Sequence, residues 1–169
     1  MICVIFLKFT SYIITVSKES ILTSILVESV IKISPLVESV CIVAQSDQTF
    51  AAAIVVPDKD NLSKLCKEIG KSGFSVAQLC QDNAVKNEFC ERLVKYGLSL
   101  GLEKFEVPKK VALVLDEWTP ESGLVTAAMK LKRKELERYY ENDIQNMYMS
   151  GYVPRGSNPS KKQSKINPV

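Results

Sequence analysis

Two apolar runs separated by a short polar turn restrict the folds that this chain can adopt. Residues 40–44 are entirely apolar and mostly β-branched, and a second apolar run covers residues 49–56. The polar residues 46–48 stand between them, and Pro57 follows the second run. This pattern predicts an antiparallel hairpin whose two strands are largely buried, because both are apolar along their length. We therefore expect a small sheet that is covered by helices.

A helix is predicted immediately before this hairpin. Apolar residues recur at helical spacing from Ser24 onward, and Pro35 ends the pattern. Glu28 and Lys32 fall on the opposite, polar side of the predicted helix. The expected apolar face consists of Leu26, Val27, Val30 and Ile31.

Two more helices are predicted after the hairpin. The first has two candidate N-caps, Asp58 and Asp60, and ends near Gly70. The second follows Asp82 and carries the clearest amphipathic stripe of the chain. The residues of that stripe are Val85, Phe89, Leu93, Tyr96 and Leu100.

The last part of the predicted domain contains a third strand, a loop and a final helix. Residues 110–115 form the predicted strand, and residues 116–129 have the composition of a loop. One helix then extends to Met149, with an apolar face formed by Leu136, Tyr140, Ile144 and Met147. The whole pattern predicts an α+β domain over residues 25–149, in which a small sheet with an antiparallel hairpin is flanked by helices.

The two ends of the chain differ from this domain in composition. Residues 1–24 are apolar, but Lys8 interrupts the run, so neither a transmembrane helix nor a signal peptide is cleanly indicated. A membrane-inserted segment over residues 1–16 stays open as an alternative. Residues 150–169 are rich in Gly, Pro, Ser, Asn and Lys, and they are predicted to be a basic, disordered tail.

The composition excludes several classes of function. The chain has no histidine, which rules out Ser-His-Asp and Cys-His catalysis. Without the four basic residues of the tail, the formal charge falls from +3 to −1, so no nucleic-acid partner is expected. The cysteines lack the spacing of a zinc site, and we expect them to be small buried hydrophobes in a reducing compartment. They are Cys3, Cys41, Cys66, Cys80 and Cys90.

The segment 118–136 carries the strongest functional signal. It forms a polar, glycine-containing loop that leads to Lys130, just before the basic start of a helix at residues 132–134. Cations near a helix N-terminus oppose the helix dipole by about 0.3–1 kcal/mol each, which indicates a role besides helix stability. The alternative is a solvated charged face, in which these cations pair with acids at helical spacing. The candidate acids are Glu135, Glu137, Glu141 and Asp143.

This segment resembles the C-terminal motif of long-chain acyl-CoA synthetases, which belong to the adenylate-forming superfamily. The family motif Trp-Thr-Pro-Glu-x-Gly-Leu-x-Thr matches residues 118–126, and its Lys-(Leu/Ile)-Lys-Arg matches residues 130–133. The resemblance extends over residues 26–149 and implies the fold of the family's C-terminal lid domain. Further similar segments are residues 34–40, 46–48, 55–57, 104–108 and 139–148.

The resemblance implies a catalytic role for Lys130. In the family, this mobile lysine lies between the fatty-acid carboxylate and the α-phosphate of ATP while acyl-adenylate and pyrophosphate form. The lid domain then rotates for thioester formation with CoA. Lys132 and Arg133 are candidates for contacts with phosphate or with a partner domain, and a solvated role is their alternative. The residues expected to position the Lys130 loop are Trp118, Thr119, Gly123 and Thr126.

The resemblance also implies cofactors and partners. An intact family enzyme uses ATP, CoA, Mg²⁺ and a long-chain fatty acid, on the cytoplasmic side of intracellular membranes such as the endoplasmic reticulum. Residues 1–23 lack the family's hinge motif, and the large adenylation domain expected upstream is absent. We therefore expect a truncated ligase fragment that has no metal site, binds none of these cofactors alone and is inactive alone. The alternative is a non-catalytic fragment that binds a full-length ligase or a membrane.

Overall fold

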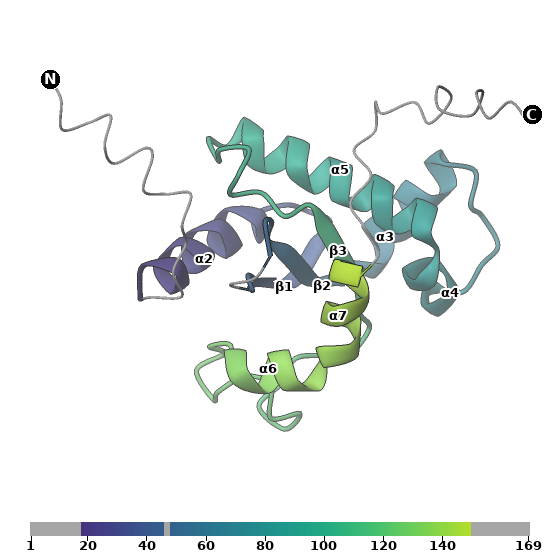
Figure 1. Cartoon of the computed structure of the whole chain (residues 1–169). Coiled ribbons are helices and arrows are strands. Elements are labelled where there is room, and N and C mark those ends of the chain that lie inside the picture. Colours follow the sequence, from purple (N-terminus) through teal and green to yellow (C-terminus); the bar gives the residue numbers. More distant parts are fainter. Residues whose placement is uncertain (1–17, 46–47, 150–169) are drawn as a thin grey trace, which may run out of the picture.

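The computed structural model describes residues 18–45 and 48–149, which form a three-stranded sheet with helices on both faces (Figure 1). The strands are β1 (Val37–Val43), β2 (Ala52–Pro57) and β3 (Lys110–Leu113). The helices of this part of the chain are α2 (Lys18–Ile31), α3 (Lys59–Glu68), α4 (Val76–Gln81), α5 (Asn83–Ser99), α6 (Arg133–Tyr139) and α7 (Glu141–Met149).

The predicted hairpin is confirmed as the antiparallel pair of β1 and β2. The central strand β2 also pairs with β3, in parallel. β1 begins earlier than predicted, because Val37 already pairs with Pro57 across an irregularity in the register. β2 begins later than predicted, at Ala52, and Phe50, which precedes it, packs on Tyr148 with the ring centroids 5.2 Å apart.

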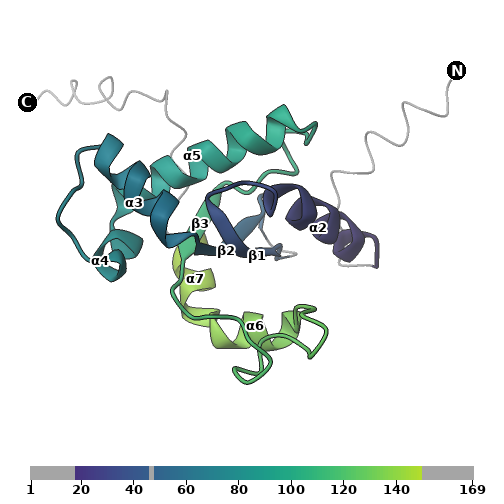
Figure 2. The same cartoon turned by 180° about the vertical axis from the view of Figure 1, so that it is seen from behind.

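Side chains of the sheet alternate between two core layers. In β2, Ala53 and Val55 belong to the core covered by α2, α3, α4 and α5, whereas Ile54 and Val56 belong to the core under α6 and α7. Figures 1 and 2 show α5 on one side of the sheet and α6 and α7 on the other. Because both faces are covered, β2 is buried at every position, which accounts for its continuous apolar sequence.

The helices after the hairpin lie where the sequence predicts them, with one addition. Asp58 caps α3, since its carboxylate accepts the backbone N–H of Asn61 at 2.9 Å. Asp82 caps α5, as its position predicts. The short helix α4 is not predicted, because its six residues are too few to show a helical period. The prediction that Leu100 continues the apolar stripe of α5 is wrong. The helix ends at Ser99, and Leu100 is 47% exposed.

The single final helix of the prediction is wrong, because the chain forms two helices there. α6 ends at Tyr139, and α7 begins at Glu141 after a change of backbone direction at Tyr140. The predicted apolar face is nevertheless buried in full, because its spacing continues across the break. That face consists of Leu136, Tyr140, Ile144 and Met147.

The faces of α2 also differ from the prediction. Val27 and Ile31 are buried as expected, but Leu26 is 67% exposed and Glu28 is only 8% exposed. Glu28 is buried because it has an ion-pair partner from a distant part of the chain, described below. α2 begins at Lys18, so it crosses residue 25, at which the sequence pattern places the start of the domain.

The cysteines of the described region are free and buried, as predicted: Cys41, Cys66, Cys80 and Cys90. Burial raises the pKa of the Cys41 and Cys90 thiols to about 12, so both stay protonated at neutral pH. Among the helices that the structure describes, none has both the length and the apolar character to cross a membrane. The predicted membrane segment, the basic tail, Cys3 and the turn residues 46–47 lie outside the described residues.

Candidate functional site

The loop that leads to Lys130 begins in a partly buried hydrogen-bond network, which runs from the buried Trp118 to the exposed Asp116. Trp118 is 5% exposed, and its indole N–H donates to the Tyr140 hydroxyl at 3.1 Å. That hydroxyl donates to a carboxylate oxygen of Asp116 at 3.0 Å. Burial, and then the hydrogen bond to Asp116, raise the pKa of Tyr140 well above its usual range, so the hydroxyl remains a donor. The network fixes the start of the loop against the helix break after α6.

A tight turn follows at residues 119–123. The Thr119 N–H donates to the Ser122 hydroxyl oxygen at 3.2 Å, and the Ser122 N–H donates to the Thr119 hydroxyl oxygen at 3.3 Å. Gly123 closes the turn with φ of 77°, a backbone conformation that costs a residue with a side chain about 1–2 kcal/mol. Thr119 and Gly123 therefore shape this turn, and that they position Lys130 for catalysis stays a prediction.

Residues 124–132 form a short hairpin, here called the Lys130 hairpin. The Thr126 N–H donates to the Lys130 carbonyl and the Lys132 N–H donates to the Leu124 carbonyl, both at 2.9 Å. The Thr126 hydroxyl oxygen also accepts the Lys130 N–H at 3.2 Å. Met129 has φ of 57°, which turns the backbone immediately before Lys130. One arm is buried through Leu124, so the hairpin is fixed at its base while its tip is exposed.

Lys130 lies at this exposed tip. Within residues 18–45 and 48–149, its ammonium group forms no ion pair, and its backbone is held on both sides by Thr126. A charged group on a long flexible side chain is thus carried on a backbone of defined shape. This arrangement can present a cation to an anionic partner without first breaking an internal ion pair.

The second arm of the Lys130 hairpin leads directly into an ion pair with α2. The Arg133 guanidinium donates to both carboxylate oxygens of Glu28, at 2.8 and 2.6 Å. Glu28 also accepts the backbone N–H of Ile42 at 2.7 Å, on the outer edge of β1. Burial alone would lower the pKa of Arg133, but the hydrogen bonds and charge of Glu28 outweigh it and leave that pKa raised. Arg133 therefore has an internal partner that joins α2, β1 and α6.

The remaining basic residues of the cluster behave differently from Arg133. Lys132 and Lys134 are exposed and form no ion pair among the residues that the structure describes. Of the acids expected to neutralise the cluster, Glu135 pairs instead with Arg138, at 3.1 Å. The exposure of Lys130, Lys132 and Lys134 fits the alternative of a solvated charged face, but the part of the chain that the structure describes shows no ion pair between them and the acids proposed as partners. Arg133 departs from a solvated role, because it pairs with Glu28.

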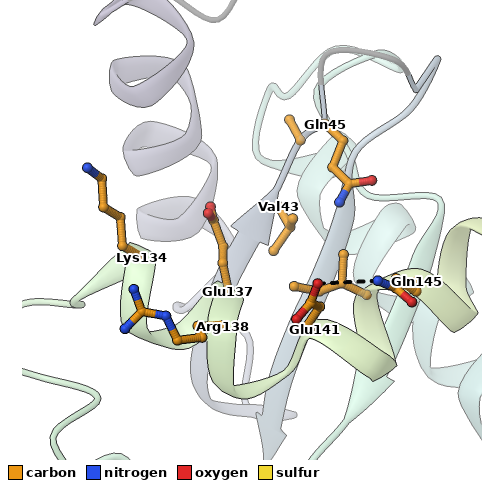
Figure 3. Close-up of a pocket in the computed structure, with 9 residues that line it drawn as sticks. Val43, Gln45, Lys134, Glu137, Arg138, Glu141 and Gln145 are labelled. Atoms are coloured by element: carbon orange, nitrogen blue, oxygen red, sulfur yellow. Dashed lines mark hydrogen bonds between the residues drawn. The ribbon is translucent and has the colours of Figure 1, made fainter.

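A shallow hollow of about 470 Å³ lies beside the end of β1, but it does not include Lys130 (Figure 3). Figure 3 shows side chains of both charge signs along α6 and the start of α7, with Glu141 hydrogen-bonded to Gln145. Its charged lining residues are Lys134, Arg138, Glu137 and Glu141. Two cations and two anions give the hollow no preference for an anion such as a phosphate.

The acidic side chains of the described residues are not gathered into a metal-binding cluster. No group of three or more acidic, cysteine or histidine side chains among these residues is arranged to hold a metal ion. Divalent magnesium is bound through oxygen ligands, above all carboxylates.

Sequence reasoning missed two residues that shape the site, Glu28 and Asp116. Glu28 lies next to Val27 and three residues before Ile31, at the border of the apolar face, and that position was the available signal. Asp116 follows the apolar run of β3 and offered no pattern of its own. The partners of both are distant in sequence, Arg133 for Glu28 and Tyr140 for Asp116.

Solved structures with this fold identify the class of protein. The adenylation domain of a carboxylic acid reductase from Segniliparus rugosus, in complex with AMP and a co-purified carboxylic acid, matches with a TM-score of 0.59 and 26% identity. The match covers 73% of this chain and 17% of that one. The corresponding domain from Mycobacterium chelonae has the same TM-score at 24% identity and supports the fold alone. The fold is that of a domain of adenylate-forming enzymes.

Sequence relatives then narrow this class. The chain is 35% identical to long chain acyl-CoA synthetase 8 of Arabidopsis thaliana over 72% of its own length. It is 32% identical to long-chain-fatty-acid–CoA ligase 4 of Saccharomyces cerevisiae over 72% of this chain. It is 35% identical to long-chain-fatty-acid–CoA ligase 5 of Mus musculus over 73% of this chain. It spans only 17–18% of the length of these relatives, and no protein-family model matches it. The chain is thus a homologue of part of the long-chain acyl-CoA synthetases.

Proposed function

We propose that this chain is the C-terminal lid portion of an ATP-dependent long-chain fatty-acid–CoA ligase, and that Lys130 is its catalytic residue. The single observation that carries the proposal is the exposed ammonium of Lys130, which forms no ion pair among the described residues and is carried on a hairpin of fixed backbone. Homology to long-chain acyl-CoA synthetases supports the reaction class, and an AMP complex of a protein with the same fold supports the nucleotide.

The proposed step is adenylation of a fatty acid. The carboxylate attacks the α-phosphorus of ATP, an acyl-adenylate forms, and pyrophosphate leaves. Two anions must approach each other, so a cation between them orients both and offsets the charge that develops on the phosphate oxygens. In the proposed mechanism Lys130 supplies this cation. A rotation of the domain then withdraws Lys130, and CoA attacks the acyl carbon to give the thioester and AMP.

The other parts of such an active site are assigned to residues outside this chain. The hollow beside β1 excludes Lys130 and has mixed charge, so it does not serve as the ATP pocket of the proposal. The chain then contributes one positioned charge, and its partner is an adenylation domain that holds ATP, CoA and the fatty acid. We place this partner on the cytoplasmic side of an intracellular membrane, as the family resemblance implies.

The test uses a chimera in which the full 169-residue chain replaces the homologous segment of the S. cerevisiae relative. The expected result is formation of palmitoyl-CoA by the chimera and none by the chain alone. A chimera that is soluble and folded but inactive would contradict the proposal and favour a non-catalytic binding fragment. Acyl-adenylate formation by the chain alone would contradict the assignment of the remaining site to a partner.

A further inference from the structure

The ion pair between Glu28 and Arg133 lies where three elements meet. Arg133 is the first residue of α6, three positions after Lys130, and Glu28 belongs to α2, 105 residues away along the chain. Both guanidinium–carboxylate contacts are short, at 2.8 and 2.6 Å, and this two-point geometry fixes orientation as well as distance. Glu28 is 8% exposed, so water screens the pair only weakly.

The edge of β1 completes the arrangement. Among the strands that the structure describes, β1 lies at the edge of the sheet, so the N–H and carbonyl of Ile42 on its outer side face no further strand of that part of the chain. Glu28 accepts this N–H at 2.7 Å, and Arg133 lies 3.5 Å from the carbonyl oxygen. The pair therefore satisfies the backbone of the sheet edge and fixes the start of α6 to it at the same time.

We propose that Glu28 and Arg133 are positioning residues for Lys130, an inference that rests on the function proposed above. The first arm of the Lys130 hairpin is anchored in the core by the buried Leu124, whereas the second arm, apart from its hydrogen bonds to the first, has only the partly buried Leu131 as a core contact before Arg133. The ion pair thus fixes the arm that carries Lys130. A displacement of about 1 Å at a catalytic group can lower a rate about 100-fold, so this connection sets the efficiency of the proposed lysine.

The first experiment measures the stability of the Lys130 hairpin directly and does not depend on an activity assay. Hydrogen exchange is followed in the full chain at the bonded amides of Thr126 and Lys132, with the sheet amide of Val114 as an internal reference. Arg133→Met is expected to accelerate exchange at both hairpin amides about 10-fold or more relative to Val114. The control Arg138→Met removes an exposed cation from the same helix and is expected to change neither.

The second experiment separates an effect of the ion pair on the position of Lys130 from its effect on the stability of the protein. Arg133→Met leaves the buried Glu28 carboxylate without a cation, so it lowers stability. The double variant Glu28→Gln/Arg133→Met removes that charge, and the introduced amide still offers an oxygen to the Ile42 N–H, so stability should recover. Adenylation by the chimera should fall about 100-fold in both variants, while thioester formation from preformed acyl-adenylate should stay within about 3-fold.

The outcomes distinguish this inference from the proposed function. Recovery of adenylation together with stability in the double variant would overturn it, because the pair would then be structural only. Unchanged exchange at the hairpin amides in Arg133→Met would also overturn it. If Lys130→Ala leaves adenylation unchanged, the proposed function fails, while the exchange experiment still decides whether the pair holds the hairpin.

Discussion

The hydrogen-bond network at the start of the Lys130 loop can be tested by removing one oxygen atom. In Tyr140→Phe the ring that packs in the core is retained, but the hydroxyl group that joins Trp118 to Asp116 is lost. The Trp118 indole N–H is then left without a partner in a region where the side chain is only 5% exposed. The exposed Asp116 carboxylate can be hydrated instead, so the indole carries most of the cost.

An unsatisfied buried donor costs about 1–3 kcal/mol, so we expect Tyr140→Phe to lower the free energy of unfolding by about 2 kcal/mol. Urea unfolding followed by tryptophan fluorescence measures this change at the site itself, because Trp118 is the only tryptophan of the chain. The matched control is Tyr139→Phe, which removes the same atom from a side chain that is 60% exposed. A loss in Tyr140→Phe no larger than in Tyr139→Phe would refute the reasoning.

Three further predictions concern stability and have separate measurements. Asp58→Ala should lower the free energy of unfolding by about 1 kcal/mol through loss of the α3 cap, and Asp60→Ala by less; equal losses would contradict the capping assignment. Gly123→Ala should cost about 1–2 kcal/mol in the same urea assay, since its φ is 77° although nothing lies near the added methyl group. Burial raises the pKa of the Cys41 and Cys90 thiols from 9.0 to about 12, so the unfolded chain loses these protons first. Stability should therefore fall from about pH 9 to about pH 12, and less steeply in Cys41→Ala; an identical slope would exclude this cause.

The sheet and most of the helices that pack on it could be predicted, because their sequence patterns are local. The β-branched runs of β1 and β2 define the hairpin, and the aspartates that cap α3 and α5 stand directly before each helix. The loop that leads to Lys130 could be singled out as a candidate site, because its Trp, Gly and Lys residues occur as one contiguous motif. The structure adds that Trp118 is buried and that Gly123 has a positive φ, which are the reasons for those residue types.

The parts that could not be predicted depend on contacts between distant residues. Glu28 lies at the border of the apolar face of its helix, but its burial depends on two partners distant in sequence, Arg133 and the backbone N–H of Ile42. The break between α6 and α7 occurs at Tyr140, where the apolar spacing continues without interruption. Phe50 belongs to the apolar run that predicts β2, yet it lies outside the strand and its ring contacts the distant Tyr148, which no local pattern reports.

The most direct test of the account measures the two half-reactions of the chimera with Lys130→Ala. Removing one positioned charge-stabilising group costs about 100- to 1,000-fold, and we expect a fall of that size in adenylation, measured as pyrophosphate exchange. Thioester formation from preformed acyl-adenylate should change little, and the control Lys95→Ala, an exposed lysine of α5, should alter neither step. Equal losses in both half-reactions, or no loss in adenylation, would contradict the role assigned to Lys130.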